Sequence, residues 1–190
     1  MKKIMLVVAL MVLAMPAMAL TVEGKNYQPT ITVADKTLNL VGAGLRKKWL
    51  FSVYTMGVYS ESGSCDTKAL INDEEVKYMR IDMVRSVSAQ KMAETLGEAF
   101  KAHMPKDASA ELKKQQQDLM SYFKDECKEG TNIEFSYVPG VGTTFKQNSK
   151  ELGETFIGKD FQVVLWDIYL GDKTCCSGLK EDILKSCKKK

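Results

Sequence analysis

The run from Trp49 to Tyr59 constrains the fold more than any other segment of the chain. It is rich in aromatic and β-branched residues, which favour strands, and the side chains of a strand alternate between two faces. One face carries Trp49, Phe51, Val53, Thr55 and Tyr59, and the other carries Leu50, Ser52, Tyr54, Met56 and Val58. Because both faces are mostly apolar, the run predicts a central strand of a sheet that is covered on both sides.

Further strand signals lie on either side of this run. The expected strands span 30–33, 37–41, 49–59, 76–84, 132–138 and 143–147. A turn at Ala34-Asp35 joins the first pair, and Pro139-Gly140-Val141-Gly142 joins the last pair. Gly42-Ala43-Gly44 is expected to interrupt the second strand, because glycine is unfavourable in a strand interior.

Helix signals are grouped between and after the strands. Ser88 can cap a first helix, and Asp107 or Ser109 can start a second. A third has apolar residues at i, i+3, i+4 and i+7 and is expected to stop at Gly171, and a short last helix spans 179–187. Blocks of strands and helices, rather than alternating βαβ units, predict an α+β fold in which helices pack on one side of an antiparallel sheet.

The first nineteen residues have the pattern of a cleavable secretory signal. Two lysines precede an apolar run over 4–13, and Ala17-Met18-Ala19 supplies the small-x-small cleavage pattern. The run is shorter than the roughly 20 residues of a membrane-spanning helix, which favours a cleaved signal. The alternative is an uncleaved N-terminal anchor. We expect a signal peptide over 1–19, one domain over 20–190, and a periplasmic or secreted protein with no integral membrane segment after cleavage near Ala19.

Charge and residue content exclude several functional classes. The full sequence has 27 basic and 24 acidic residues, and removing the two lysines of the signal leaves the chain nearly neutral. A nearly neutral chain offers no electrostatic argument for a nucleic-acid partner. The single histidine, His103, gives no support to a hydrolytic triad, and its place near a helix end predicts a dipole contact or exposure. Without C-x-x-C spacing, no metal and no cofactor is expected.

Five cysteines follow the signal: Cys65, Cys127, Cys175, Cys176 and Cys187. Disulfides form in the oxidising compartments that exported proteins reach, and an odd count leaves at least one thiol unpaired. Adjacent cysteines rarely bond each other, because the geometry is strained. We therefore expect Cys175 or Cys176 to pair with Cys187.

Several blocks of the sequence resemble the chalcone isomerase family. Residues 40–46, LVGAGLR, and 53–59, VYTMGVY, match the G-A-G-x-R stretch and the F-T-x-x-G-V-Y strand of the plant enzymes. Residues 134–143, 157–161 and 168–172 are similar to an exported bacterial branch of that family. The resemblance implies an open-faced β-sandwich, a large antiparallel sheet covered by a layer of helices, with a ligand cleft between the two layers.

The resemblance also implies two ligand-binding residues, and a third candidate shares a strand face with one of them. Arg46 matches the family's arginine, whose planar, permanently charged guanidinium can hold a carboxylate with two hydrogen bonds or stabilise a phenolate or enolate. Without the resemblance, Arg46 and the two lysines that follow it would indicate an exposed basic hairpin tip. Thr55 matches the family's threonine, and Tyr59 on the same face either lines the cleft or packs in the core. Tyr54, on the other face, is expected to be core.

Two functions are compatible with these residues. The tyrosine and asparagine of the plant catalysts have no counterpart, since between Val84 and Phe123 the only tyrosine is Tyr122 and there is no asparagine. The resemblance therefore favours a non-catalytic protein that binds a small amphipathic anion such as a fatty acid. The alternative is an isomerase, an intramolecular lyase in which Arg46 stabilises an anionic nucleophile and Thr55 polarises a carbonyl.

Overall fold

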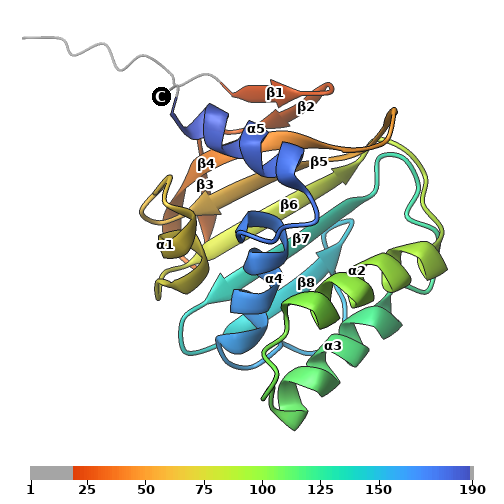
Figure 1. Ribbon diagram of the computed structural model, residues 1–190. Helices are drawn as coiled ribbons and strands as arrows, with labels where there is room; N and C mark the ends of the chain where they lie inside the picture. The colour runs from red at the N-terminus through yellow and green to blue at the C-terminus, as the bar shows by residue number, and fades with distance from the viewer. Residues whose placement is uncertain (1–18, 189–190) are drawn as a thin grey trace, which may run out of the picture.

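A seven-stranded antiparallel sheet forms the centre of the molecule (Figure 1). The computed structural model describes residues 19–188, so residues 1–18 of the signal peptide predicted over 1–19 lie outside the described residues. The strands lie side by side in sequence order: β3 Thr30–Val33, β4 Lys36–Lys48, β5 Phe51–Ser60, β6 Lys77–Met83, β7 Asn132–Val138, β8 Gly142–Gln147 and β9 Lys150–Glu151. A separate two-stranded hairpin consists of β1 Leu20–Val22 and β2 Lys25–Tyr27.

The helices of the described chain lie on the same side of this sheet in Figure 1. They are α1 Thr67–Asn72, α2 Ala89–His103, α3 Ala110–Tyr122, α4 Asp160–Leu170 and α5 Ser177–Cys187. The predicted α+β class, an antiparallel sheet covered by a layer of helices, is confirmed. Within residues 19–188, no helix is long and apolar enough to cross a membrane.

The ends of the helices follow from local sequence. The hydroxyl of Ser88 accepts a hydrogen bond from the backbone N–H of Lys91, and the hydroxyl of Ser109 accepts one from Leu112. Each bond satisfies one of the N–H groups that the first turn of a helix leaves free. Gly171 caps α4 as predicted. These starts and stops were therefore predictable without tertiary information.

Strand β4 differs from its prediction, because it continues through Gly42-Ala43-Gly44. The glycines permit close packing of α5 against the sheet. A Cβ atom on Gly44 would lie 2.7 Å from the Cβ of Asp182, and one on Gly42 would overlap the carbonyl oxygen of Ile183. The hydroxyl of Ser186 also donates to the carbonyl oxygen of Ala43 (3.1 Å). The glycine motif is thus a helix-docking surface inside a continuous strand.

The sheet is covered on both faces. The larger core lies between the sheet and the helices and includes Phe100, Phe135 and Trp166. The smaller core lies on the opposite face, where Tyr27 of the β1–β2 hairpin packs among Leu38, Leu40 and Tyr59. From Thr55 to Ser60, strand β5 therefore buries side chains on both sides, as its sequence predicted. Trp49 and Leu50, which were expected in this strand, lie instead in the exposed turn before it.

The predicted disulfide is wrong, because Cys187 is bonded to Cys65. Cys176 caps the start of α5 and Cys187 ends it. An 11-residue helix is about 16 Å long, whereas bonded cysteines need Cα atoms within roughly 7 Å. The Cα atoms of Cys65 and Cys187 are 5.9 Å apart. Cys127, Cys175 and Cys176 are free thiols.

His103 lies in the last turn of α2 as predicted, but the alternative of an exposed side chain is wrong, because it is only 6% exposed and contacts another helix. Its Nδ1 lies 2.7 Å from Oδ2 of Asp167. The contact ties the end of α2 to α4.

Candidate functional site

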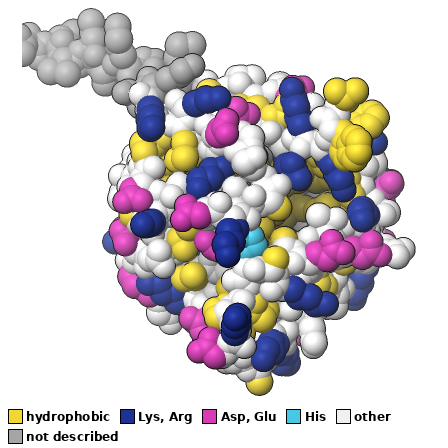
Figure 2. All heavy atoms as spheres, in the orientation of Figure 1, with side chains coloured by type: hydrophobic (Ala, Val, Ile, Leu, Met, Phe, Trp, Pro, Cys, Tyr) yellow, Lys and Arg dark blue, Asp and Glu magenta, His cyan; other side chains and the backbone are white. Residues whose placement is uncertain are grey.

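A cavity of about 710 Å³ lies between the sheet and the helices. This volume falls within the range of pockets that bind small molecules. The interior is apolar, with a floor of Ile81, Ile133 and Phe135 and walls of Val87, Met92, Leu96, Ala99, Phe123 and Ile168. Figure 2 shows the opening as a hollow with a hydrophobic floor. The cavity lies where the resemblance placed the ligand cleft, between the two layers.

The basic side chains that line the cavity are Arg46, Lys48, Arg85 and Lys91. No Asp or Glu is among the described lining residues. The cavity therefore combines an apolar interior with a positively charged lining, which suits an anion that carries an apolar tail.

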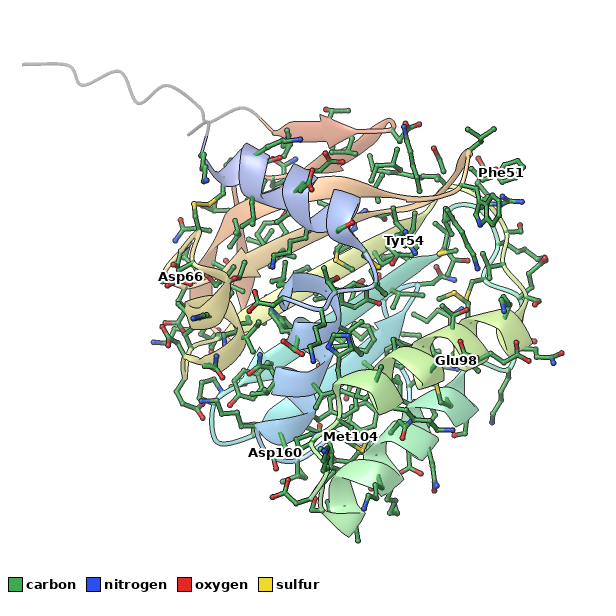
Figure 3. The ribbon with its side chains drawn as sticks, viewed as in Figure 1. Phe51, Tyr54, Asp66, Glu98, Met104 and Asp160 are labelled. Carbon is green, nitrogen blue, oxygen red and sulfur yellow. A yellow bond between two sulfur atoms is a disulfide. The ribbon has the colours of Figure 1, made fainter. Side chains whose placement is uncertain are left out.

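The position of Arg46 follows from the alternation of β4. Gly42, Gly44 and Arg46 point to the same face, and α5 covers the two glycines. Since α5 begins after Cys176, the helix does not extend over Arg46. The half-buried side chain of Arg46 therefore lies at the cavity. Arg46 pairs across the strands with Tyr54, which Figure 3 shows between the sheet and the helices.

Neutral hydroxyl groups accompany the guanidinium. Tyr54 and Tyr169 both line the cavity. Burial raises the pKa of both phenols well above the ordinary value of 10, and the nearby Arg46 only partly opposes this. Both therefore stay protonated at physiological pH and can donate hydrogen bonds to an anion.

A pair of adjacent thiols completes this part of the cavity. The Sγ atoms of Cys175 and Cys176 lie 2.8 Å apart. Hydrogen bonding from the Cys176 thiol, with a further contribution from the charge of Arg46, lowers the pKa of Cys175 to about 6 despite partial burial. The same contact and burial raise the pKa of Cys176. At neutral pH the pair therefore carries its negative charge on Cys175.

The structure does not bring Thr55 and Tyr59 to this cavity. Arg46 lies opposite Tyr54 but Lys47 lies opposite Ser52, so Val53 is an extra residue in the pairing. An extra residue reverses the face on which the following side chains lie. Val53 and Tyr54 therefore both line the cavity, whereas Thr55 points to the opposite face of the sheet.

Thr55 belongs to a buried polar network on that opposite face. Its hydroxyl lies 2.7 Å from the Tyr27 hydroxyl, which donates to the carboxylate of Asp82 at 3.0 Å. Since a tyrosine has one hydroxyl proton, Thr55 is the donor to Tyr27. Tyr59 packs edge-on against Tyr78 at a centroid distance of 5.8 Å and lines a separate polar hollow.

Three cavity residues were missed from the sequence. Regular alternation predicts Tyr54 in the core, but the F-T-x-x-G-V-Y pattern laid over 53–59 places Tyr54 at its threonine position, which could have marked it. Tyr169 lies inside a block that resembles the family, which could have marked it. The sequence indicates Cys175 only as a possible disulfide partner.

No group of three or more His, Cys, Asp or Glu that could hold a metal occurs among residues 19–188. Cys175 and Cys176 are the only thiols among the described residues that line the cavity.

Comparisons with known proteins agree with this architecture. A family model described as chalcone isomerase-like matches residues 19–185. Among solved structures, a fatty-acid binding protein of Arabidopsis thaliana is similar, with a TM-score of 0.71 and 17% sequence identity. The match covers 89% of this chain and 97% of that chain, which at this identity shows a shared fold. A sequence search of curated proteins found no match.

Proposed function

This chain belongs to the chalcone isomerase-like family, and we propose that its cavity binds a small amphipathic anion such as a fatty acid. The observation that carries the proposal is the lining of the cavity, which is apolar inside, has four basic side chains and includes no Asp or Glu among the described residues. The similar Arabidopsis protein is named for fatty-acid binding, which supports this class of ligand.

Arg46 is the residue that we assign to the carboxylate. Its guanidinium offers parallel donors that match the two oxygens of a carboxylate. Tyr54 and Tyr169 supply neutral hydroxyl donors beside it, and the acyl chain would lie over Ile81 and Phe135. Arg85 suits the role less well, because its guanidinium stacks 4.9 Å from the ring of Phe51 at the rim.

Calorimetric titration of palmitate into delipidated protein tests this assignment. Hydrogen bonds to charged groups contribute about 1.5–3 kcal/mol, so Arg46→Ala should weaken palmitate binding by roughly 10- to 100-fold. Lys47→Ala is the matched control, because Lys47 is the adjacent exposed cation and does not line the cavity. Hexadecanol, which has no carboxylate, should bind the wild type and Arg46→Ala equally.

Two results would contradict the proposal. Equal palmitate affinity in the wild type and Arg46→Ala would remove Arg46 from the site. The absence of binding to any fatty acid would remove this class of ligand.

No structural observation favours the isomerase alternative. That alternative assigned carbonyl polarisation to Thr55, whose hydroxyl instead donates to Tyr27 on the other face of the sheet. We therefore propose binding without catalysis.

We also propose that the chain is exported, in line with the resemblance to an exported bacterial branch. The N-terminal signal pattern supports this, and so does the Cys65–Cys187 bond, since stable disulfides are typical of oxidising compartments. The expected product begins near Leu20 in the periplasm or medium. Intact-mass measurement of protein from each cell fraction checks the location and the cleavage site together, and full-length protein confined to the cytoplasm would refute export.

A further inference from the structure

The β4–β5 hairpin ends in three consecutive apolar side chains that face solvent. Trp49 is 89% exposed, Leu50 is 96% exposed and Phe51 is 62% exposed. Figure 3 shows Phe51 at the outer end of this hairpin. Large exposed apolar groups in contiguous positions mark interaction surfaces more often than isolated ones do. Trp49 also has a φ of 59°, a conformation that costs energy for a residue other than glycine.

Basic side chains surround this tip. Arg46, Lys47 and Lys48 precede it directly, and Arg85 stacks on Phe51 at 4.9 Å. The hairpin from Lys36 to Ser60 contains no Asp or Glu. Among the described residues, none of these four basic side chains lies within salt-bridge distance of a carboxylate, whereas Lys91 on α2 is paired with Glu94 at 3.6 Å. The tip therefore presents apolar groups next to basic side chains that have no carboxylate partner.

The tip also borders the mouth of the cavity. Trp49, Leu50 and Phe51 are among the residues that border the cavity. In Figure 2, a hydrophobic group projects beside the hollow, with basic side chains between the two. A surface that holds the tip would therefore lie next to the opening through which a ligand enters.

We propose that this hairpin tip docks the protein on an anionic lipid bilayer. Trp49, Leu50 and Phe51 enter the boundary between headgroups and acyl chains, where tryptophan and other amphipathic or apolar groups partition. Lys47, Lys48 and Arg85 contact the anionic headgroups. A membrane fits better than a protein partner, because three side chains on a convex tip offer less than the roughly 800 Å² per partner of a standard protein interface.

The docking surface goes beyond the proposed ligand-binding function and does not require it. Docking can be measured without any fatty acid, and palmitate binding can be measured without vesicles. Failure of one proposal is therefore distinguishable from failure of the other.

The two tryptophans provide a direct measurement. Trp49 is exposed and Trp166 is fully buried, so changes in an added quencher's access report mainly on Trp49. Protein that begins at Leu20 contains both hydrophobic cores and is suitable for the test. Vesicles of phosphatidylglycerol and phosphatidylcholine should shift the emission to shorter wavelength and protect it from acrylamide. Trp49→Ala should abolish both responses, and vesicles of phosphatidylcholine alone should give a much weaker one.

Charge variants test the basic residues. Each Lys near an anionic surface strengthens membrane binding by about fivefold, so Lys47→Gln with Lys48→Gln should weaken vesicle partitioning by about 25-fold. High salt should reduce binding of the wild type in the same direction. Lys106→Gln with Lys113→Gln is the matched control, because it removes the same charge from exposed positions outside the cavity lining.

Apolar variants test the tip while they keep Trp49 as the reporter. Leu50→Ala with Phe51→Ala should weaken partitioning by at least about tenfold, because acyl-region contacts are lost. Ile157→Ala is the control, since Ile157 is an exposed apolar residue that does not line the cavity.

Three outcomes would overturn the proposal. One is unchanged emission and quenching of Trp49 with anionic vesicles at low salt. Another is equal loss of binding in the control variants. The third is a dimer, detected by sedimentation, that the tip variants convert to a monomer while vesicles bind neither form, because a second copy of the chain would then be the occupant.

Discussion

Removing the Cys65–Cys187 disulfide is expected to destabilise the fold more than any other change at a cysteine. The bond joins residues separated by 122 positions. The loss of unfolded-chain entropy for a loop of this length corresponds to about 5 kcal/mol. A domain of this size has a total unfolding free energy of roughly 5–15 kcal/mol. Cys65→Ser with Cys187→Ser should therefore lose a third or more of the stability.

Urea unfolding followed by circular dichroism measures this loss. The matched control is Cys175→Ser with Cys176→Ser, which removes two sulfurs at the other end of α5 without breaking a bond. Wild-type protein with its disulfide reduced should unfold at the urea concentration of the Cys65/Cys187 variant.

The alternative pairing, across α5, predicts a different result. A loop the length of α5, 11 residues, would contribute only about 3 kcal/mol, and the loss would then appear in the Cys175/Cys176 control. A control as destabilised as the Cys65/Cys187 variant, or a Cys65/Cys187 variant as stable as the wild type, would refute the loop argument.

Three further changes give measurable outcomes. Gly44→Ala should lower the unfolding free energy by about 1–3 kcal/mol, because the added Cβ would lie 2.7 Å from a Cβ of α5; thermal unfolding measures it, and an unchanged midpoint would contradict the close packing. Thr55→Val should lower the unfolding free energy, measured with urea, by about 1 kcal/mol, because Tyr27 loses its hydrogen-bond donor. Palmitate affinity should stay unchanged, and a large loss of affinity would place Thr55 in the site. With its pKa lowered to about 6, Cys175 is a thiolate above that pH, so iodoacetamide labelling, read by peptide mass spectrometry, should rise from pH 5 to 7 and then level off. Cys127, whose pKa burial raises, should stay unlabelled over that range, and equal labelling of both thiols would refute the prediction.

Local sequence accounts for most of the secondary structure. Ser88, Ser109 and Gly171 carry the capping chemistry that begins or ends a helix, and strand β7 matches its predicted span. These features depend on neighbouring residues alone, so no tertiary contact is needed to predict them. The hairpin β1–β2, helix α1 and strand β9 were missed, because short elements have weak periodicity and are held by packing.

The candidate site was less predictable than the fold. The resemblance identified Arg46, and the alternation of β4 does place it at the cavity. The resemblance also identified Thr55, and regular alternation puts Thr55 and Tyr59 on the face of Phe51 and Val53. One extra residue at Val53 reverses that pattern, and pairing irregularities depend on both strands rather than on either sequence alone.

The sequence by itself determined the class of fold, the central position of β5, the starts of α2 and α3, and the presence of an arginine with a family counterpart. Only the tertiary structure decided which cysteines bond, which face Thr55 occupies, and that Tyr54, Tyr169 and Cys175 meet at Arg46. The physical reason is the separation along the chain of the residues that interact. Strand propensity and helix capping act between neighbours in the chain, whereas the Cys65–Cys187 bond and the cavity bring together residues more than a hundred positions apart.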